Sequence, residues 1–207
     1  MKKFVVFLCV LVSCISTEAQ SEKMQTLFNG NQVSSGGYGA VSSRFTTIRG
    51  KYTHMAGVYG GWYVNNRFMV GMGAAASTNN IRVPEEFSMN TNKDMTWQYG
   101  QFGLMTEYVV ASDKAAHLVF QLFAGAGFTL QYDRNNWHHD DYRDVYDQNW
   151  FTVVEPGVQV ELNLLKWMRF SPGVSYRASF GSDGLGLSDK DLRGVSYHAT
   201  LKFGKWR

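Results

Sequence analysis

The C-terminal segment of the chain alternates strictly between apolar and polar or small residues from Val195 to Gly204. An alternation with a period of two is typical of a β-strand that has one apolar and one polar face. A tilted strand needs roughly 9–11 residues to cross a bilayer, which is about the length of this segment. The pattern therefore predicts a transmembrane β-strand. Its apolar positions are Val195, Tyr197, Ala199, Leu201 and Phe203.

The same alternation recurs upstream and predicts seven further strands, of which the one at 117–132 is the clearest. In each of them, aliphatic and aromatic side chains occupy one face, while the other face contains most of the polar residues and many of the glycines. The predicted strands cover residues 37–48, 52–64, 67–77, 97–110, 117–132, 150–164, 167–179 and 195–204.

The lengths of the connections predict the topology. Those after the second, fourth and sixth strands are short, and those after the third, fifth and seventh are long and polar. Only Arg49-Gly50, after the first strand, breaks this pattern. Outer-membrane barrels have short periplasmic turns and long extracellular loops. We therefore predict an all-β fold, an eight-stranded antiparallel up-and-down transmembrane β-barrel with both termini in the periplasm. Local bulges are expected at Pro156 and Pro172, because proline donates no ladder hydrogen bond.

The N-terminus predicts export. Lys2 and Lys3 precede an apolar run, and Thr17-Glu18-Ala19 has small residues at the positions that signal peptidase reads, which predicts cleavage between Ala19 and Gln20. In the alternative, Leu11-Val12-Ser13-Cys14 is a lipoprotein box with Cys14 lipidated. After cleavage at Ala19 the mature chain has no cysteine, which excludes disulfides and thiol chemistry. The predicted organisation is a signal peptide at 1–19, a periplasmic lead-in at 20–35 and the barrel at 36–207.

Composition agrees with a β-rich membrane protein. Hydrophobic residues make up 44% of the chain and the mean hydropathy is −0.25. Beyond the signal there is no run of about 20 apolar residues, which excludes a bundle of membrane helices. Aromatic residues make up 15%, and there are 21 glycines but only 3 prolines. The net charge of +3 comes from dispersed basic residues, so nucleic acid is not an expected partner.

A soluble eight-stranded barrel, such as a lipocalin-like binder, alternates equally well but with its apolar face inward. The terminal strand, the export signal and the loop pattern favour the membrane, which places the polar face in the lumen. Charges directed into so narrow a space are expected to pair, since unpaired buried charge is costly. An ion path or substrate site is the alternative interpretation. The predicted luminal charges are Arg44, Glu107, Glu155, Glu161, Arg169, Arg177 and Lys202.

Three other patterns raise the question of chemistry. The loop segment Trp137-His138-His139-Asp140-Asp141 contains metal-ligating residue types, but adjacent histidines on an extended chain point apart. His198 shares a strand face with Ser196 and Thr200, which raises the alternative of a lipid hydrolase. The orienting carboxylate of a triad can only be guessed as Glu107 or Glu155, so we interpret His198 as a luminal hydrogen-bonding histidine. Aromatic residues near strand ends are interpreted as interface girdles. We assign no catalytic, cofactor or metal residue. The girdle residues are Trp62, Tyr63, Tyr108, Tyr132, Trp150 and Trp167.

Several short motifs are distributed along the chain. They are Gly36-Gly37-Tyr38-Gly39, Gly60-Gly61-Trp62 with Asn65-Asn66, Val154-Glu155-Pro156-Gly157-Val158 with Val160-Glu161-Leu162-Asn163, Gly173-Val174-Ser175-Tyr176-Arg177, Gly186-Leu187-Ser188-Asp189-Lys190-Asp191-Leu192 and Leu201-Lys202-Phe203-Gly204-Lys205. Together these motifs resemble a family of small outer-membrane β-barrel proteins of Bacteroidetes-type bacteria. The resemblance covers nearly the whole mature chain and implies a location and a fold, but it carries over no catalytic residue.

These observations predict a structural or surface-interaction protein of the outer membrane that presents three long loops outside the cell. A narrow pore for ions or small solutes is the first alternative, and a lipid-modifying enzyme is the second. We expect a monomer without a cofactor whose partners are outer-membrane lipid and lipopolysaccharide. The sequence identifies no protein partner.

Overall fold

The structure is a computed structural model that describes residues 35–64, 67–111, 114–133 and 145–205. All of these residues belong to one compact unit, residues 34–207. The predicted signal peptide and, apart from Ser35, the predicted lead-in lie outside the described residues. Within the described ranges, no helix is long and apolar enough to cross a membrane.

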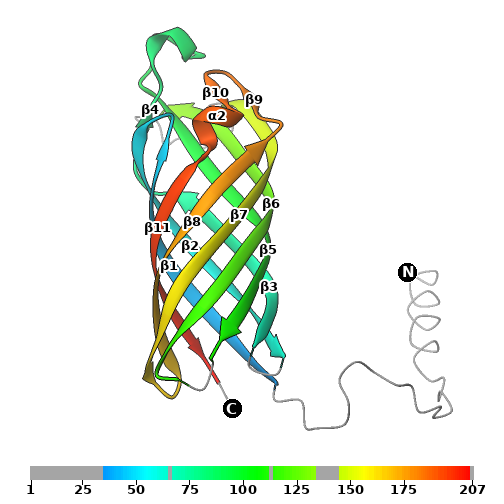
Figure 1. The fold of residues 1–207 in the computed structure, drawn as a ribbon. Helices are drawn as coiled ribbons and strands as arrows, with labels where there is room; N and C mark the ends of the chain where they lie inside the picture. The colour runs from blue at the N-terminus through cyan, green and yellow to red at the C-terminus, as the bar shows by residue number, and fades with distance from the viewer. Residues whose placement is uncertain (1–34, 65–66, 112–113, 134–144, 206–207) are drawn as a thin grey trace, which may run out of the picture. The chain divides into compact units, whose positions relative to one another are not determined.

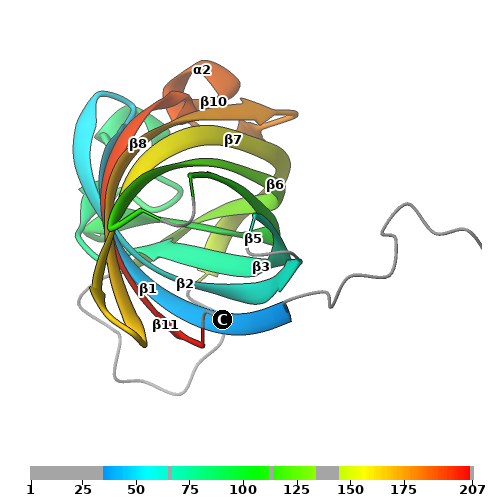
Figure 2. The same ribbon diagram turned by 60° about the horizontal axis from the view of Figure 1, so that its bottom comes forward.

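Eight long strands form a closed antiparallel ring (Figures 1 and 2). Strand β1 pairs with the last strand, β11, and β3 pairs with β5, so the sheet has no free edge. The predicted eight-stranded antiparallel barrel is confirmed. The strands are β1 (Ser35–Ile48), β2 (Lys51–Val64), β3 (Phe68–Ser77), β5 (Met95–Val110), β6 (Ala116–Asp133), β7 (Val145–Leu165), β8 (Met168–Phe180) and β11 (Gly194–Gly204).

Short elements gather at the end of the barrel opposite the C-terminal end of β11 (Figure 1). They lie in the connections between β3 and β5 and between β8 and β11, which the sequence predicts only as polar loops. A side chain fixes the start of the short helix, because the amide and hydroxyl of Ser188 donate to Asp191 at 3.0 and 2.6 Å. The elements are β4 (Ile81–Arg82), η1 (Glu85–Phe87), β9 (Asp183–Gly184), β10 (Leu187–Ser188) and α2 (Asp189–Leu192).

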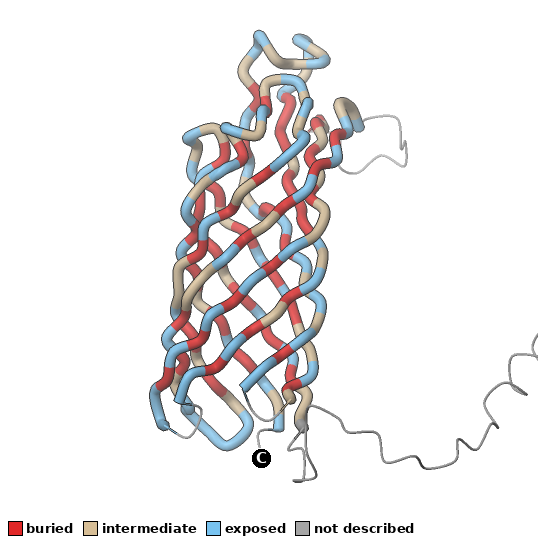
Figure 3. Tube along the Cα trace, turned by 45° about the vertical axis from the view of Figure 1, so that its right-hand side comes forward, coloured by how far each residue is buried: buried red, intermediate tan, exposed pale blue. Residues whose placement is uncertain are grey.

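Buried and exposed residues alternate along the strands, as Figure 3 shows. The outward positions are apolar: Trp62, Met72 and Tyr197 have exposed fractions of 67%, 65% and 64%. The inward positions carry most of the polar and charged side chains. This arrangement is the reverse of a soluble barrel and suits a hydrocarbon solvent. The soluble alternative is therefore wrong, and the predicted inside and outside faces are correct.

No register shift, and so none of the expected bulges, occurs at Pro156 or Pro172, although the β7–β8 pairing skips residues 155–156 and 160–161 beside the two prolines. Pro156 lies opposite Leu122 of β6, and Pro172 lies opposite Ala199 of β11, each in an unbroken register. The register shifts instead near Thr129 and near Asn163. Both proline rings lie on the exposed face. Each proline removes only one N–H from the ladder, and the paired residues on either side hold the register.

The short connection between β1 and β2 is a two-residue turn. Arg49 and Gly50 both have a positive φ, 49° and 69°, as a type I′ hairpin turn requires. The Arg49 amide donates to the carbonyl of Asp191 at 2.7 Å, which ties this turn to the connection before β11. This tight turn is the reason that the first connection breaks the alternation of loop lengths.

Candidate functional site

The seven predicted luminal charges all lie inside the barrel, each with an exposed fraction of 8% or less. They come from five strands: β1, β5, β7, β8 and β11. Burying a charge is unfavourable unless an opposite charge and hydrogen bonds replace its water. The partners of these residues therefore decide what the interior can do.

The largest group, the Lys202 cluster, comprises Lys202, Glu107, Glu161, Arg169 and His117. The Lys202 ammonium donates to both oxygens of Glu107 at 2.8 Å and lies 2.6 Å from Oε2 of Glu161. The other oxygen of Glu161 lies 2.5 Å from Nη1 of Arg169 and 2.9 Å from Nε2 of His117. The two carboxylates thus share two permanent cations, so the cluster is neutral when His117 is neutral.

Three tyrosines complete the surroundings of Glu107. The hydroxyls of Tyr38, Tyr59 and Tyr63 donate to its carboxylate at 2.7, 3.2 and 3.1 Å. Gln159 adds a fourth neutral donor at 3.1 Å. A carboxylate that accepts this many hydrogen bonds is held firmly in one position. Glu107 is therefore a fixed structural group of the interior.

A second ionic group, the Glu155 cluster, comprises Glu155, Arg44, Gln101 and Ser175. Nη1 of Arg44 donates to both oxygens of Glu155 at 3.2 and 3.1 Å. The carboxylate also accepts the Gln101 amide at 2.8 Å and the Ser175 hydroxyl at 2.5 Å. This cluster is neutral as well, so the interior contains two separately balanced groups of charges.

Neutral amides extend from the Lys202 cluster to a buried imidazole. Nε2 of Gln159 donates to Oε1 of Gln121 at 2.5 Å, and Nε2 of Gln121 lies 3.2 Å from Nε2 of His198. Gly173 makes room for this ring, since a Cβ there would lie 2.6 Å from Cε1 of His198. Hydrogen bonds therefore lead from His198 through both amides to Glu107.

Arg177 departs from the predicted pattern. Its guanidinium donates to the carbonyls of Leu192 and Thr47 at 2.7 and 2.9 Å and lies 4.8 Å from the ring centroid of Tyr99. No carboxylate lies within ion-pair distance of it in the described part of the chain. The expectation that every luminal charge pairs with another is wrong for Arg177, because backbone carbonyls near the barrel end supply its acceptors.

The end of the barrel that holds the short elements is filled by apolar side chains. Ile48, Ile81, Trp97, Leu187 and Leu192 are fully buried there. The Arg49 side chain links elements in this region, since its guanidinium lies 4.3 Å from the Phe87 ring centroid and within 4.0 Å of Glu86 and Asp191. Packing and this arginine therefore connect three chain segments into one cap.

Several residues of the interior are not singled out by the sequence, namely His117, the glutamines and the tyrosines. The prediction that Tyr63 belongs to the interface girdle is wrong, because this residue is 1% exposed and donates to Glu107. The signal is present in the sequence: Tyr59 and Tyr63 alternate with the outward Val58 and Trp62. Strand phase predicts the side on which these rings lie better than residue type does.

The structure does not strengthen the two other chemical candidates, the metal site and the hydrolase. The segment Trp137–Asp141 lies outside the described residues, and the described residues contain no group of three or more potential metal ligands. Ser196 and His198 are both buried, but the polar contact of the imidazole is with the Gln121 amide. The described geometry thus assembles buried ion pairs and hydrogen bonds, not a recognisable triad.

Comparisons with known proteins agree with this architecture. A family model described as "Outer membrane protein beta-barrel domain" matches residues 7–203. A search of curated proteins finds no match. Neisserial surface protein A superposes with a TM-score of 0.56 at 8% identity, covering 82% of this chain and 96% of its own. A major outer membrane protein of Thermus thermophilus gives 0.51 at 10% identity, covering 81% and 98%.

The attachment invasion locus protein of Yersinia pestis is also similar. Its structure in complex with the heparin analogue sucrose octasulfate has a TM-score of 0.51 at 10% identity, covering 83% of this chain and 99% of its own. At such low identities, the three superpositions carry the fold and nothing about a ligand.

Proposed function

Because this chain belongs to the family of outer membrane protein β-barrel domains and is located in the cell outer membrane, we propose that it has a structural or surface-interaction role. In this proposal side chains block the lumen, and the long connections face the outside of the cell. The narrower resemblance to barrels of Bacteroidetes-type bacteria is part of the proposal.

The observation that supports a blocked lumen is the position of the ion pair between Glu107 and Lys202. Glu107 is on β5 and Lys202 is on β11, and these strands stand four places apart in the ring of eight. The pair therefore joins opposite walls of the barrel. Tyr38 on β1 reaches Glu107 from a third direction. An eight-stranded barrel has room for little more than its own side chains, so such a bridge obstructs solutes.

The proposed orientation of the barrel in the membrane rests on the different lengths of the connections at its two ends. The connections at 78–94, 134–144 and 181–193 share one end with the β1–β2 turn, while the opposite end has the turns at 65–67, 111–115 and 166–167. Long connections mark the outer side of such barrels. Because loops carry most binding residues, we assign recognition to this end.

Single-channel recording tests the blocked lumen. Purified protein in planar bilayers is expected to show no steady conductance. Replacing both charges of the crossing pair by alanine, in Glu107→Ala/Lys202→Ala, is expected to increase current, because it removes the bridge while keeping the interior neutral. Reproducible steps of uniform size from the unaltered protein would contradict the blocked lumen and favour the narrow pore instead.

Labelling of intact cells tests the orientation. An epitope inserted after Asn136 is expected to bind antibody on whole cells, and one inserted at Asp113 is not. External protease is expected to cut most readily near Arg134 or Arg143. Labelling at Asp113 alone would invert the topology and remove the basis for recognition at the long connections.

The remaining expectations stay predictions. We propose that the protein is not an enzyme, uses no cofactor and is a monomer in contact with outer-membrane lipid and lipopolysaccharide. The buried ion pairs support this view, because the carboxylates of Glu107, Glu155 and Glu161 are already bound to cationic side chains. Hydrolysis of phospholipid by the purified protein, abolished in a His198→Gln variant, would favour the lipid-modifying enzyme.

A further inference from the structure

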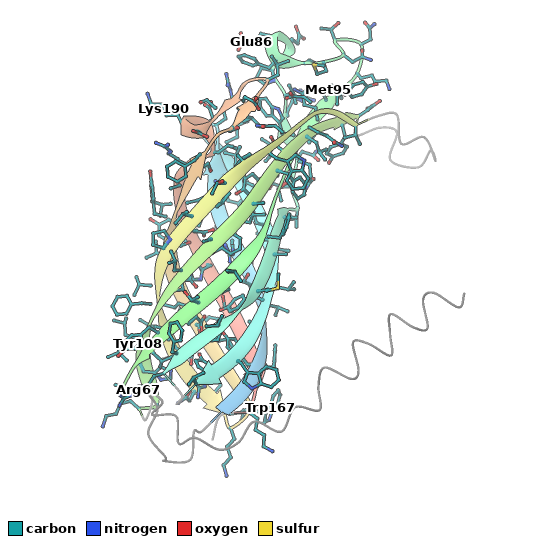
Figure 4. The ribbon with its side chains drawn as sticks, turned by 90° about the vertical axis from the view of Figure 1, so that its right-hand side faces the viewer. Arg67, Glu86, Met95, Tyr108, Trp167 and Lys190 are labelled. Atoms are coloured by element: carbon teal, nitrogen blue, oxygen red, sulfur yellow. The ribbon has the colours of Figure 1, made fainter. Side chains whose placement is uncertain are left out.

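The exposed charges at the two ends of the barrel differ in kind. At the end with the short turns, the described exposed charges are all basic: Arg67, Lys114, Lys166 and Lys205. The sequence of these turns contains a single acidic residue, Asp113. The opposite end mixes both signs. Figure 4 shows Arg67 and Trp167 at the first end and Glu86 and Lys190 at the other.

Exposed apolar side chains stand beside these basic residues. Lys166 lies between Leu165 and Trp167, which are 49% and 55% exposed, and Arg67 precedes Phe68, which is 46% exposed. The Trp167 ring stacks on Phe203, two residues before Lys205, with the ring centroids 6.1 Å apart.

A hollow of about 580 Å³ lies at the β7–β8 turn. Lys166 and two leucines line it, together with Arg169 of β8, whose guanidinium is paired with Glu161 inside the barrel. The lining residues are Asn163, Leu164, Leu165, Lys166 and Arg169.

This combination fits a lipid headgroup better than a soluble polyanion. Aromatic and leucine side chains enter the boundary between headgroups and acyl chains, and lysine or arginine reaches from there to the phosphates. A polyanion in the aqueous phase would contact the cations but leave the apolar side chains exposed to water. The rim therefore has the features of a membrane-interface contact.

We propose that this basic rim, defined as Arg67, Lys114, Lys166 and Lys205 with Trp167, binds the headgroups of anionic phospholipids. The periplasmic leaflet as the location of these lipids follows from the orientation in the proposed function. The preference for anionic lipid itself does not depend on that orientation. Each basic residue near an anionic surface increases binding about fivefold, so a measurable preference is expected.

The test uses the purified full-length mature protein in phosphatidylcholine bilayers. Trace spin-labelled phosphatidylglycerol or phosphatidylcholine is added, and the fraction immobilised at the protein is measured. The protein is expected to prefer phosphatidylglycerol about fivefold at low salt, and 1 M NaCl should abolish this preference. Inorganic phosphate at constant ionic strength should leave it unchanged. Equal immobilisation of both lipids, or displacement by phosphate, would overturn the proposal.

Two matched triple variants locate the effect. Arg67→Gln/Lys166→Gln/Lys205→Gln removes one arginine and two lysines from the rim, and is expected to lower the preference below about twofold. Its control, Lys51→Gln/Arg82→Gln/Lys190→Gln, removes the same residue types from the opposite end and should keep the full preference.

An equal loss of preference in both triple variants would contradict a rim site. Gel migration with and without heating shows whether each variant is folded. If the triple variant does not fold, the single Lys166→Gln variant replaces it and should at least halve the preference for phosphatidylglycerol.

Whole-cell labelling does not depend on this result. An experiment that rejects lipid binding at the basic rim can therefore be distinguished from one that rejects the proposed orientation.

Discussion

Removing the charge of Lys202 is the most direct test of the interior. In Lys202→Met the side chain keeps a similar length, but its ammonium no longer bridges Glu107 and Glu161. Glu161 keeps Arg169 at 2.5 Å, whereas Glu107 loses the cation that the structure places against both of its oxygens. The variant therefore leaves one buried carboxylate without a counter-ion.

The expected loss follows from that unpaired charge. Breaking a buried ion pair by removing one partner costs about 3–5 kcal/mol. Glu107 retains four neutral donors, three tyrosine hydroxyls and the Gln159 amide, so we expect a value near the lower limit. Neutralising both partners, in Lys202→Met/Glu107→Gln, removes the unpaired charge and should recover most of the loss. The two substitutions should therefore be strongly non-additive.

The assay is reversible urea unfolding from phospholipid vesicles, followed by tryptophan fluorescence and by gel migration. Lys190→Met on the exposed helix α2 is the matched control, and its effect should stay within about 0.5 kcal/mol. A loss below about 1 kcal/mol in Lys202→Met would contradict the reasoning. Additive effects in the double variant would show that the pair is not an energetic unit.

Three further predictions use the same titration. Leu122→Arg places a charge on the outer wall and should cost roughly 2–4 kcal/mol if it lies near the membrane midplane; an unchanged midpoint would contradict the outward assignment. Gly173→Ala should cost about 1–3 kcal/mol, because the new Cβ would lie 2.6 Å from both the Val158 carbonyl oxygen and the His198 ring, while Gly39→Ala, with open space around it, should cost less. Tyr63→Phe should cost about 1.5–3 kcal/mol, since it removes a hydrogen bond to the charged Glu107.

The strands were predictable because every strand of the barrel has the same surroundings on its two faces. Lipid outside and polar side chains inside impose a period of two, so the predicted strand at 117–132 lies within one residue of β6 at each end. The bulges expected at the prolines are absent because the paired residues that flank each ring outweigh the one lost donor. The short elements β9, β10 and α2 carry no such period, and contacts within the cap determine them.

The partners of the inward charges could not be predicted in the same way. Strand phase places Glu107 and Lys202 inside, but they are 95 residues apart and come from opposite walls. Their meeting depends on the stagger of every strand around the ring, and in particular on the closing pair β1–β11. Arg177 shows the same limit, since its height along the axis decides that it meets carbonyls rather than a carboxylate.

The proposed blocked lumen also restricts where this protein can bind a partner. The two ionic clusters and the apolar cap place paired and packed side chains in the interior, so under this proposal binding is left to the outer wall and the two ends. The wall is apolar and suits acyl chains. The ends differ in charge: one mixes Glu86 and Lys190, while the other combines Arg67 and Lys166 with exposed aromatic rings. Because neither end resembles the other chemically, each should recognise a different surface, and residues of the ends rather than of the lumen should determine the biological role.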